Sequence, residues 1–182
     1  MPVVYYLNSL TPGHVEHTTS VDEIPTSFEL AGSIFFCMLC EDFTFYFAHR
    51  FLHLPFIYPY IHKMHHQFTT TVGLAAEYAH PVEFALANML PISVGPALLG
   101  PNMHLISVLA WYVIRIGETL DGHCGYDFSF SPYRLIPFSG SAAYHDFHHS
   151  ANVGNYGSFF SIWDTVFGTN KPFYEHLAER EI

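Results

Sequence analysis

Residues 28–53 read FELAGSIFFCMLCEDFTFYFAHRFLH. The first twenty of these residues carry no charge apart from Glu29 and the neighbouring pair Glu41 and Asp42. A membrane-spanning helix needs about 20 predominantly apolar residues, so this stretch predicts a helix that could cross a bilayer. Because a carboxylate in lipid is costly, we expect the acidic pair to lie near water or against protein.

Two further apolar segments follow at residues 82–99 and 103–116, and a Gly-Pro-Asn turn at 100–102 separates them. Pro91 and Pro96 interrupt the first segment. A helix of some fifteen residues reaches about 23 Å, which is short of a hydrocarbon core of roughly 30 Å. We therefore expect a helical hairpin that enters the membrane and crosses it only where the bilayer thins.

The composition of the 182 residues fits a membrane protein better than a soluble one. Half of them (50%) are apolar and 12% are charged, against roughly 25% charged in a typical globular domain. The low charge excludes a disordered tail, and six Lys and Arg against sixteen Asp and Glu argue against a nucleic-acid binder. Three cysteines give no disulfide framework of the secreted type. The unexplained excess is fourteen histidines.

Most of these histidines fall into short motifs. The pattern His-x-x-His-His occurs at 62–66 (HKMHH) and at 145–149 (HDFHH), and His49 and His53 form a His-x-x-x-His pair. Even at this histidine content, chance makes the combination improbable by about two orders of magnitude or more. Positions i, i+3 and i+4 share one helix face, so we expect each copy to present three imidazoles to one point. The motifs predict a metal site.

The number of imidazoles predicts two metal ions. Eight histidines in three motifs, joined by His123, exceed the roughly four to six ligands that one ion takes. An all-nitrogen ligand set suits Fe, Zn, Cu or Ni. A carboxylate-bridged di-iron bundle would need two Glu-x-x-His pairs, whereas this chain has only Glu77-x-x-His80.

Acidic side chains near the motifs could hold the outer ring nitrogens, since ligating imidazoles usually donate their second N–H to a carboxylate or a carbonyl. The candidates are Asp42, Glu77, Glu118, Asp121, Asp127 and Asp146. Asp127 is singled out because a helical His123-x-x-x-Asp127 segment would place both side chains on one face. It could then bind a metal directly or accept a hydrogen bond from His123, and both alternatives stay open.

The order of these motifs between apolar segments resembles the fatty acid hydroxylase superfamily of membrane non-haem di-iron enzymes. Within it, the motifs are most similar to those of the C-4 methylsterol monooxygenase branch. The resemblance covers about residues 33–170. It is carried by ED at 41–42, HRFLH at 49–53, IHKMHH at 61–66, EYAHP at 77–81, ETLDGHCGYD at 118–127, LIPF at 135–138, HDFHH at 145–149, GNYGSF at 154–159 and WDTVFGT at 163–169.

The resemblance implies an all-α integral membrane protein, in which transmembrane or hairpin helices support a cytosolic helical cap with a histidine-rich dimetal site. The site would face the cytosol at the endoplasmic reticulum membrane and hold two iron ions. Its ligands would be His49, His53, His62, His65, His66, His123, His145, His148 and His149. His80 would be a tenth, Asp146 a further candidate near the metals, and related hydroxylases have a histidine where Asp127 stands.

The implied reaction is oxidation of the C-4 methyl group of a sterol intermediate through alcohol and aldehyde to carboxylic acid. Oxygen is the oxidant, and cytochrome b5 with its NAD(P)H-dependent reductase supplies electrons. A separate dehydrogenase then removes the carboxyl group. Two alternatives are a hydroxylase or desaturase of fatty acyl or sphingoid lipids, and a truncated relative that binds metal in the membrane without catalysis.

We expect three regions along the chain. Residues 1–27 form an N-terminal surface segment, residues 28–170 the hydroxylase-like domain, and residues 171–182 a C-terminal tail. Members of the superfamily usually have another hydrophobic span before the first histidine motif. The expectation is therefore that this chain is a fragment, an isoform or a shortened gene product.

Overall fold

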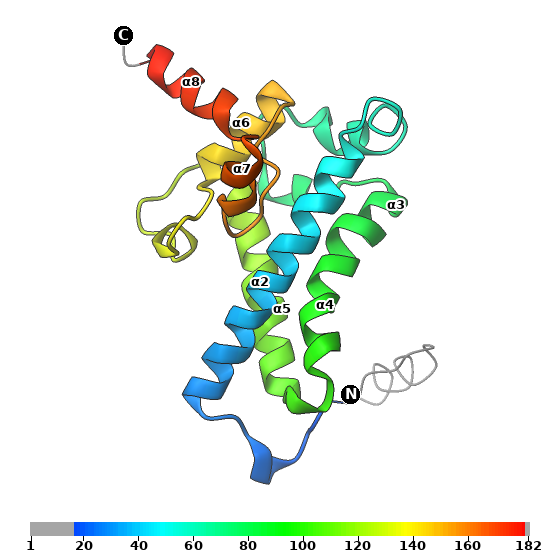
Figure 1. Cartoon of the computed structure of the whole chain (residues 1–182), viewed down its shortest axis with the longest axis vertical. Helices are drawn as coiled ribbons and strands as arrows, with labels where there is room; N and C mark the ends of the chain where they lie inside the picture. The colour runs from blue at the N-terminus through cyan, green and yellow to red at the C-terminus, as the bar shows by residue number, and fades with distance from the viewer. Residues whose placement is uncertain (1–16, 181–182) are drawn as a thin grey trace.

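Three long helical segments run side by side along the long axis of the molecule (Figure 1). The computed structural model describes residues 17–180. The long segments are α2 (Ser27–Leu52), α4 (Leu90–Leu99) with the turns that lead into it, and α5 (Leu105–Gly122). Within the described residues there are two isolated β-bridges and no strand. The prediction of an all-α fold is confirmed.

Shorter helices gather at one end of this bundle and form a cap (Figure 1). They are α6 (Ala142–Ala151), α7 (Ile162–Phe167) and α8 (Lys171–Arg180). Short 3₁₀ turns complete the chain: η1 (Val21–Glu23), η2 (His62–Gln67), η3 (Gly73–Glu77), η5 (Gly100–Asn102) and η6 (Tyr133–Leu135). The expected C-terminal tail is thus helical as far as Arg180.

Helix α2 begins at a capping box. The Thr26 hydroxyl accepts a hydrogen bond from the Glu29 N–H, and the Glu29 carboxylate accepts one from the Thr26 N–H at 2.8 Å. The acidic pair further along α2 is fully buried. Arg115 of α5 donates to Glu41 at 2.5 Å, and Asp42 accepts from the backbone N–H of Phe160 at 2.8 Å. The pair therefore faces protein.

Two helical segments are long and apolar enough to cross a membrane: α2 and the run Pro81–Asn102. Only 28% of the most apolar window of each is buried, whereas the core helix of a soluble protein is mostly buried. Phenylalanines along α2, such as Phe28 and Phe35, are exposed. Such apolar surface fits a lipid environment.

The second segment is longer than expected because its prolines do not interrupt it. It is built from α3 (Pro81–Glu83), the π-helical turn η4 (Phe84–Met89) and α4, without a break. Pro91 directly follows the π-helical turn, where the Leu90 N–H donates to the Ala85 carbonyl, five residues back. Pro96 deprives the Ile92 carbonyl of its helical donor, and the indole N–H of Trp111 on α5 donates to that oxygen instead, at 2.8 Å. The expected limit of some fifteen residues is therefore wrong, since the run to Asn102 has 22.

Helices α2 and α4 pack closely where Gly95 meets Cys37. A Cβ atom on Gly95 would lie 2.7 Å from the Cys37 Cα, so only glycine fits this contact. Cys37 is buried with a free thiol and belongs to the apolar core, together with Met38, Met103, Val108, Trp111, Phe159 and Phe160. The close approach of two backbones at a small residue is typical of helix pairs in membranes.

The described part of the expected N-terminal surface segment lies against the turn between α4 and α5. The Leu105 N–H donates to the Thr18 carbonyl at 2.9 Å, and the His104 ring donates to the Ser20 carbonyl at 3.2 Å. Residues 1–16, which make up the rest of that segment, and residues 181–182 of the expected tail lie outside the described residues.

Candidate metal centre

Nine histidines come together where α2 meets the cap. Seven of them are buried, and His53 and His145 are half-buried. They come from the end of α2 (His49, His53), from η2 (His62, His65, His66), from the C-cap of α5 (His123) and from α6 (His145, His148, His149). Four segments that are distant in sequence therefore build one site.

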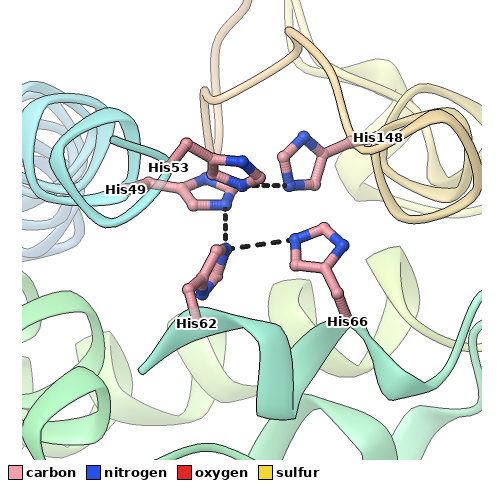
Figure 2. A group of neighbouring side chains, drawn as sticks. All are labelled: His49, His53, His62, His66 and His148. Carbon is pink, nitrogen blue, oxygen red and sulfur yellow. Dashed lines mark hydrogen bonds between the residues drawn. The ribbon is translucent and has the colours of Figure 1, made fainter. Parts of the chain in front are cut away.

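The ring nitrogens form two adjacent groups, and each group could hold a metal ion. In each, one nitrogen from every ring lies within 4.8 Å of all the others. Figure 2 shows the first group, in which two rings of α2 face rings of η2 and α6. The two groups lie in contact: His66 of the first group stacks on His149 of the second, with ring centroids 4.6 Å apart. The first group is His49, His53, His62, His66 and His148; the second is His65, His123, His145 and His149.

Each His-x-x-His-His motif serves both groups. In η2, the first and last histidines (His62 and His66) point to the first group, and the middle one points to the second. In α6 the arrangement is reversed: the middle histidine, His148, points to the first group, and His145 and His149 point to the second. The expectation that one motif presents three imidazoles to one point is therefore wrong. Side chains at i and i+4 share a direction here, and the i+3 ring diverges enough to reach the neighbouring group.

In five of the nine histidines the outer ring nitrogen, Nδ1, forms a hydrogen bond with a backbone carbonyl. Because a carbonyl oxygen can only accept, Nδ1 of each such ring carries the proton, and the lone pair of the neutral ring is on Nε2. The Nδ1–H donors and their acceptors are His49 to Tyr156 (3.0 Å), His65 to Tyr78 (3.3 Å), His123 to Thr119 (2.8 Å), His148 to Gly154 (2.5 Å) and His149 to Phe68 (3.1 Å).

The inner Nε2 atoms then face one another across each group. In the first group the Nε2 atoms of His49 and His62 are 3.1 Å apart, and in the second those of His65 and His123 are 3.3 Å apart. Both rings of each pair are protonated on Nδ1, so two lone pairs meet with no hydrogen between them. Ligand nitrogens about 2.1 Å from a common ion lie roughly 3–4 Å from each other. The spacing fits a shared cation.

A metal ion fits this role better than a proton. Burial lowers the pKa of His65 to about 3 and that of His149 to about 4, so both rings are neutral at physiological pH. Neutral imidazoles are metal ligands, and an all-nitrogen donor set suits a transition metal. The residues present therefore fit one ion at each group.

Glu83 holds the outer nitrogen of a sixth ring, and it is absent from the acidic residues that the sequence patterns single out. The His62 Nδ1–H donates to the Glu83 carboxylate at 2.7 Å, and both side chains are buried. Glu83 is an acidic residue at the start of an apolar segment, and that position was the available signal. The carboxylate fixes the ring of His62 as an outer-shell partner does in metal sites.

A small cavity touches both groups. Its volume is about 30 Å³, and its walls include His49 and His62 of the first group and His65, His123 and His145 of the second. Such a volume holds a water or a diatomic molecule and is far too small for a lipid. The small side chains of Ala76 and Ala87 keep it open.

The sequence model for fatty acid hydroxylases matches residues 34–169, a stretch that contains all nine histidines. The chain belongs to the fatty acid hydroxylase family. This confirms the resemblance drawn from the motifs.

Curated relatives include methylsterol monooxygenases. Methylsterol monooxygenase 2-2 of Arabidopsis thaliana is 42% identical over 153 residues, which cover 82% of this chain and 56% of the relative. Methylsterol monooxygenase 1 of Gallus gallus is 41% identical over 160 residues (88% and 53%). A very-long-chain aldehyde decarbonylase of Oryza sativa subsp. japonica is 39% identical over 155 residues (84% and 57%). The chain thus spans a little over half the length of these family members, and no solved structure matches it significantly.

Asp127 of this family member lies outside both groups. Its carboxylate pairs with Arg134 at 2.7 Å on the surface. The argument for Asp127 required a helix through residues 123–127, but α5 ends at Gly122 and Gly125 has a positive φ of 77°. The helical face shared with His123 is therefore absent.

Two further candidates from the sequence, His80 and Asp146, have structural contacts instead. The His80 ring accepts a hydrogen bond from the Val82 N–H at 3.2 Å and so caps α3. Asp146 accepts from the Thr71 hydroxyl at 3.1 Å and fastens the loop after η2 to α6. Neither residue belongs to a nitrogen group.

Proposed function

We propose that this chain oxidises the C-4 methyl group of a sterol intermediate through alcohol and aldehyde to carboxylic acid, at a histidine-ligated pair of iron ions. The observation that carries the proposal is the convergence of unprotonated Nε2 atoms into two adjacent groups, in a chain about 41–42% identical to methylsterol monooxygenases. An unactivated methyl group offers no handle for acid–base chemistry, so a redox metal with O2 is required.

The chain's own residues would hold and shield the metals. Each of the nine histidines is a ligand in this proposal, divided five and four between the groups. The bound iron pair supplies the oxidising chemistry. The outer hydrogen bonds of six rings, including that of His62 to Glu83, fix the direction of the Nε2 atom of those rings. Burial of the rings keeps water away from the reacting centre.

Electrons must come from a partner in this proposal. The sequence contains no Gly-x-Gly-x-x-Gly or Walker motif, so a nucleotide cofactor has no recognisable site in this chain. Cytochrome b5 and its NAD(P)H-dependent reductase are the proposed donors, and a separate decarboxylating dehydrogenase would use the product. We place the centre at the cytosolic face of the endoplasmic reticulum membrane.

A second candidate is oxidation of a long-chain lipid, either a fatty acyl or a sphingoid chain. It is favoured by the family's description as fatty acid hydroxylases and by relatives named very-long-chain aldehyde decarbonylases. The histidine groups set the chemistry, whereas the substrate depends on the cavity that is offered to it. The two candidates therefore share the centre and differ in the lipid.

The test is incubation of membranes containing the full chain with 4,4-dimethyl sterol, NADH, reductase, cytochrome b5 and O2. We expect sterol 4-carboxylic acid from the protein as expressed and from His176→Ala, a variant outside both groups. His148→Ala should form no acid but still insert into the membrane, because a ring of the first group adds nothing to the apolar helices. Oxidation of long-chain lipids alone would favour the second candidate. A metal-filled protein that oxidises neither lipid would identify a non-catalytic relative.

A further inference from the structure

An exposed aromatic loop connects α5 to the cap. Five large apolar side chains of residues 126–138 project from it, and together they form what we call the aromatic loop. Their exposed fractions are 69% for Tyr126, 40% for Phe128, 78% for Phe130, 75% for Leu135 and 73% for Phe138. The rings of Tyr126, Phe128 and Phe130 stack in sequence, with centroids 5.7 and 5.1 Å apart.

The loop is fixed in place, so its exposure is built into the fold. The buried Ser131 hydroxyl donates to the Asp121 carboxylate of α5 at 2.9 Å. The Tyr133 ring rests on α5 at Gly117, where an added Cβ would lie 2.1 Å from the Tyr133 hydroxyl oxygen. These two contacts hold the middle of the loop against the helix and leave the apolar side chains on either side of it pointing outward.

The contacts also draw the loop back along α5, away from the cap. Asp121 lies near the end of α5, and Gly117 lies one turn further from the cap. Figure 1 shows the yellow-green loop descending beside the long helices. The loop therefore occupies the level at which the long helices leave the cap.

Helix α5 carries an exposed apolar stripe toward this loop. The stripe consists of Ile106, Leu109, Val113, Ile116 and Leu120, whose spacings of three and four residues place them on one face. Gly117, where Tyr133 rests, follows Val113 by four residues and so borders the same face. The stripe thus runs along α5 toward the place where the loop is held, and α5 packs against α2 and α4, which belong to the two segments that could cross a membrane.

We infer that the aromatic loop enters the lipid–water interface of a bilayer and anchors the cap there. Aromatic side chains are enriched at membrane interfaces, where ring bodies lie among acyl chains and polar groups reach the headgroups. The loop carries its own polar groups at its edge, the partly exposed ion pair of Arg134 and Asp127. The lipid surface is favoured as the partner because the loop continues an apolar stripe and presents little charge to a protein.

The test places a fluorescent reporter on the loop. The reporter is Phe130→Trp, because the exposed Phe130 side chain leaves room for the larger indole. The matched control is Tyr174→Trp, at an exposed position on α8 of the cap. Each full-length variant is reconstituted in phosphatidylcholine vesicles with bromines on the upper acyl carbons. The signal of the unsubstituted protein, from Trp111 and Trp163, is subtracted. For Phe130→Trp we expect roughly a twofold or greater loss of the added emission, and for Tyr174→Trp almost none.

Two outcomes would overturn the inference. Quenching of the Trp at position 130 by aqueous acrylamide, without quenching by brominated lipid, would place the loop in water. Protection from both quenchers would show that protein covers the loop, and a second copy of the chain would then be the partner to seek. The measurement needs neither metal nor turnover, so its result is separate from that of the proposed function.

Discussion

Glu83 shows how a single side chain can fix the orientation of an imidazole in the candidate metal centre. It accepts from Nδ1 of His62, so the His62 Nε2 must face the inside of the first group. No other ring in either group has a carboxylate partner; among the described residues, the other recorded outer partners are backbone carbonyls.

Replacing Glu83 tests this directly. Glu83→Ala leaves the His62 N–H without an acceptor, and we expect a loss of about 10- to 100-fold in metal affinity. Glu83→Gln keeps an oxygen acceptor and should lose less. Glu77→Gln, at an exposed position nearby, serves as the control and should bind metal normally. The metal content of the three variants is measured after dialysis against increasing concentrations of a chelator. If Glu83→Ala retained as much metal as Glu77→Gln, Glu83 would not contribute to metal binding through His62.

Asp127 leads to the opposite expectation. Because its carboxylate pairs with Arg134 on the surface, Asp127→Asn should keep its full metal content. The exposed pair contributes less than about 1 kcal/mol, so the free energy of unfolding should change little. Metal analysis by mass spectrometry and a denaturant titration provide the two readings. Loss of an ion in this variant would show that the carboxylate moves to the centre in the metal-loaded protein.

At this scale the sequence predicts the histidines but not their division. Two His-x-x-His-His motifs and a His-x-x-x-His pair identify eight of the nine rings, because chance does not produce such spacing. The sequence does not reveal which ring joins which group, because that depends on how η2 and α6 are turned toward each other. The sequence does not predict the role of Glu83, because Glu83 is 21 residues from His62 and only folding brings the two side chains into contact.

Among the elements, the proline-containing segment shows what sequence patterns leave out. Pro91 and Pro96 predict breaks because proline removes a helical hydrogen bond. The fold replaces the bond lost at Pro96 with a donor from another helix, Trp111, and Pro91 directly follows the π-helical turn η4. Only the packing of α5 against α4 reveals this compensation.

The Trp111 contact can be tested by a double-mutant cycle. Trp111→Phe removes the donor to the Ile92 carbonyl, and we expect a loss of about 1–3 kcal/mol from the buried acceptor besides any packing loss. Pro96→Ala supplies a backbone N–H to the same carbonyl, so it should recover part of that loss when the two changes are combined. Denaturant unfolding in detergent gives the free energy of unfolding of the unsubstituted protein, of each single variant and of the double variant. Strict additivity of the two changes would show that the indole hydrogen bond contributes nothing.

For the whole molecule, the histidine centre is also a structural joint. It connects α2, the loop region of η2, the end of α5 and α6, and it adds to the aromatic contacts between α2 and α7, such as Phe43 with Trp163 and Tyr46 with Phe167. The sequence predicts apolar helices and a histidine-rich cap as separate parts. It does not reveal that the site joins the cap to the helices, because that follows from which chain segments meet.

Removing the metal should therefore loosen the cap. A ligand that binds only the folded state stabilises it by about 4 kcal/mol at 1,000 times its Kd, so a strong chelator should lower the melting temperature. We also expect faster proteolysis between residues 54 and 80, on either side of η2. The double variant His145→Ala, His148→Ala should respond little to the chelator. An unchanged melting temperature after complete metal loss would show that apolar packing alone holds the cap.

The division of each motif between the groups couples the filling of one position to the filling of the other. An ion in the first group fixes His62 and His66, and the turn that carries them also carries His65 of the second group. Helix α6 transmits the same effect through His148 to its two neighbours. Binding of the first ion would then order most of the backbone of η2 and α6. The second ion would bind to a site that is already preorganised. If both groups hold a metal and that metal is scarce, a population of this protein would consist mainly of empty and fully loaded chains, with few singly occupied molecules between them.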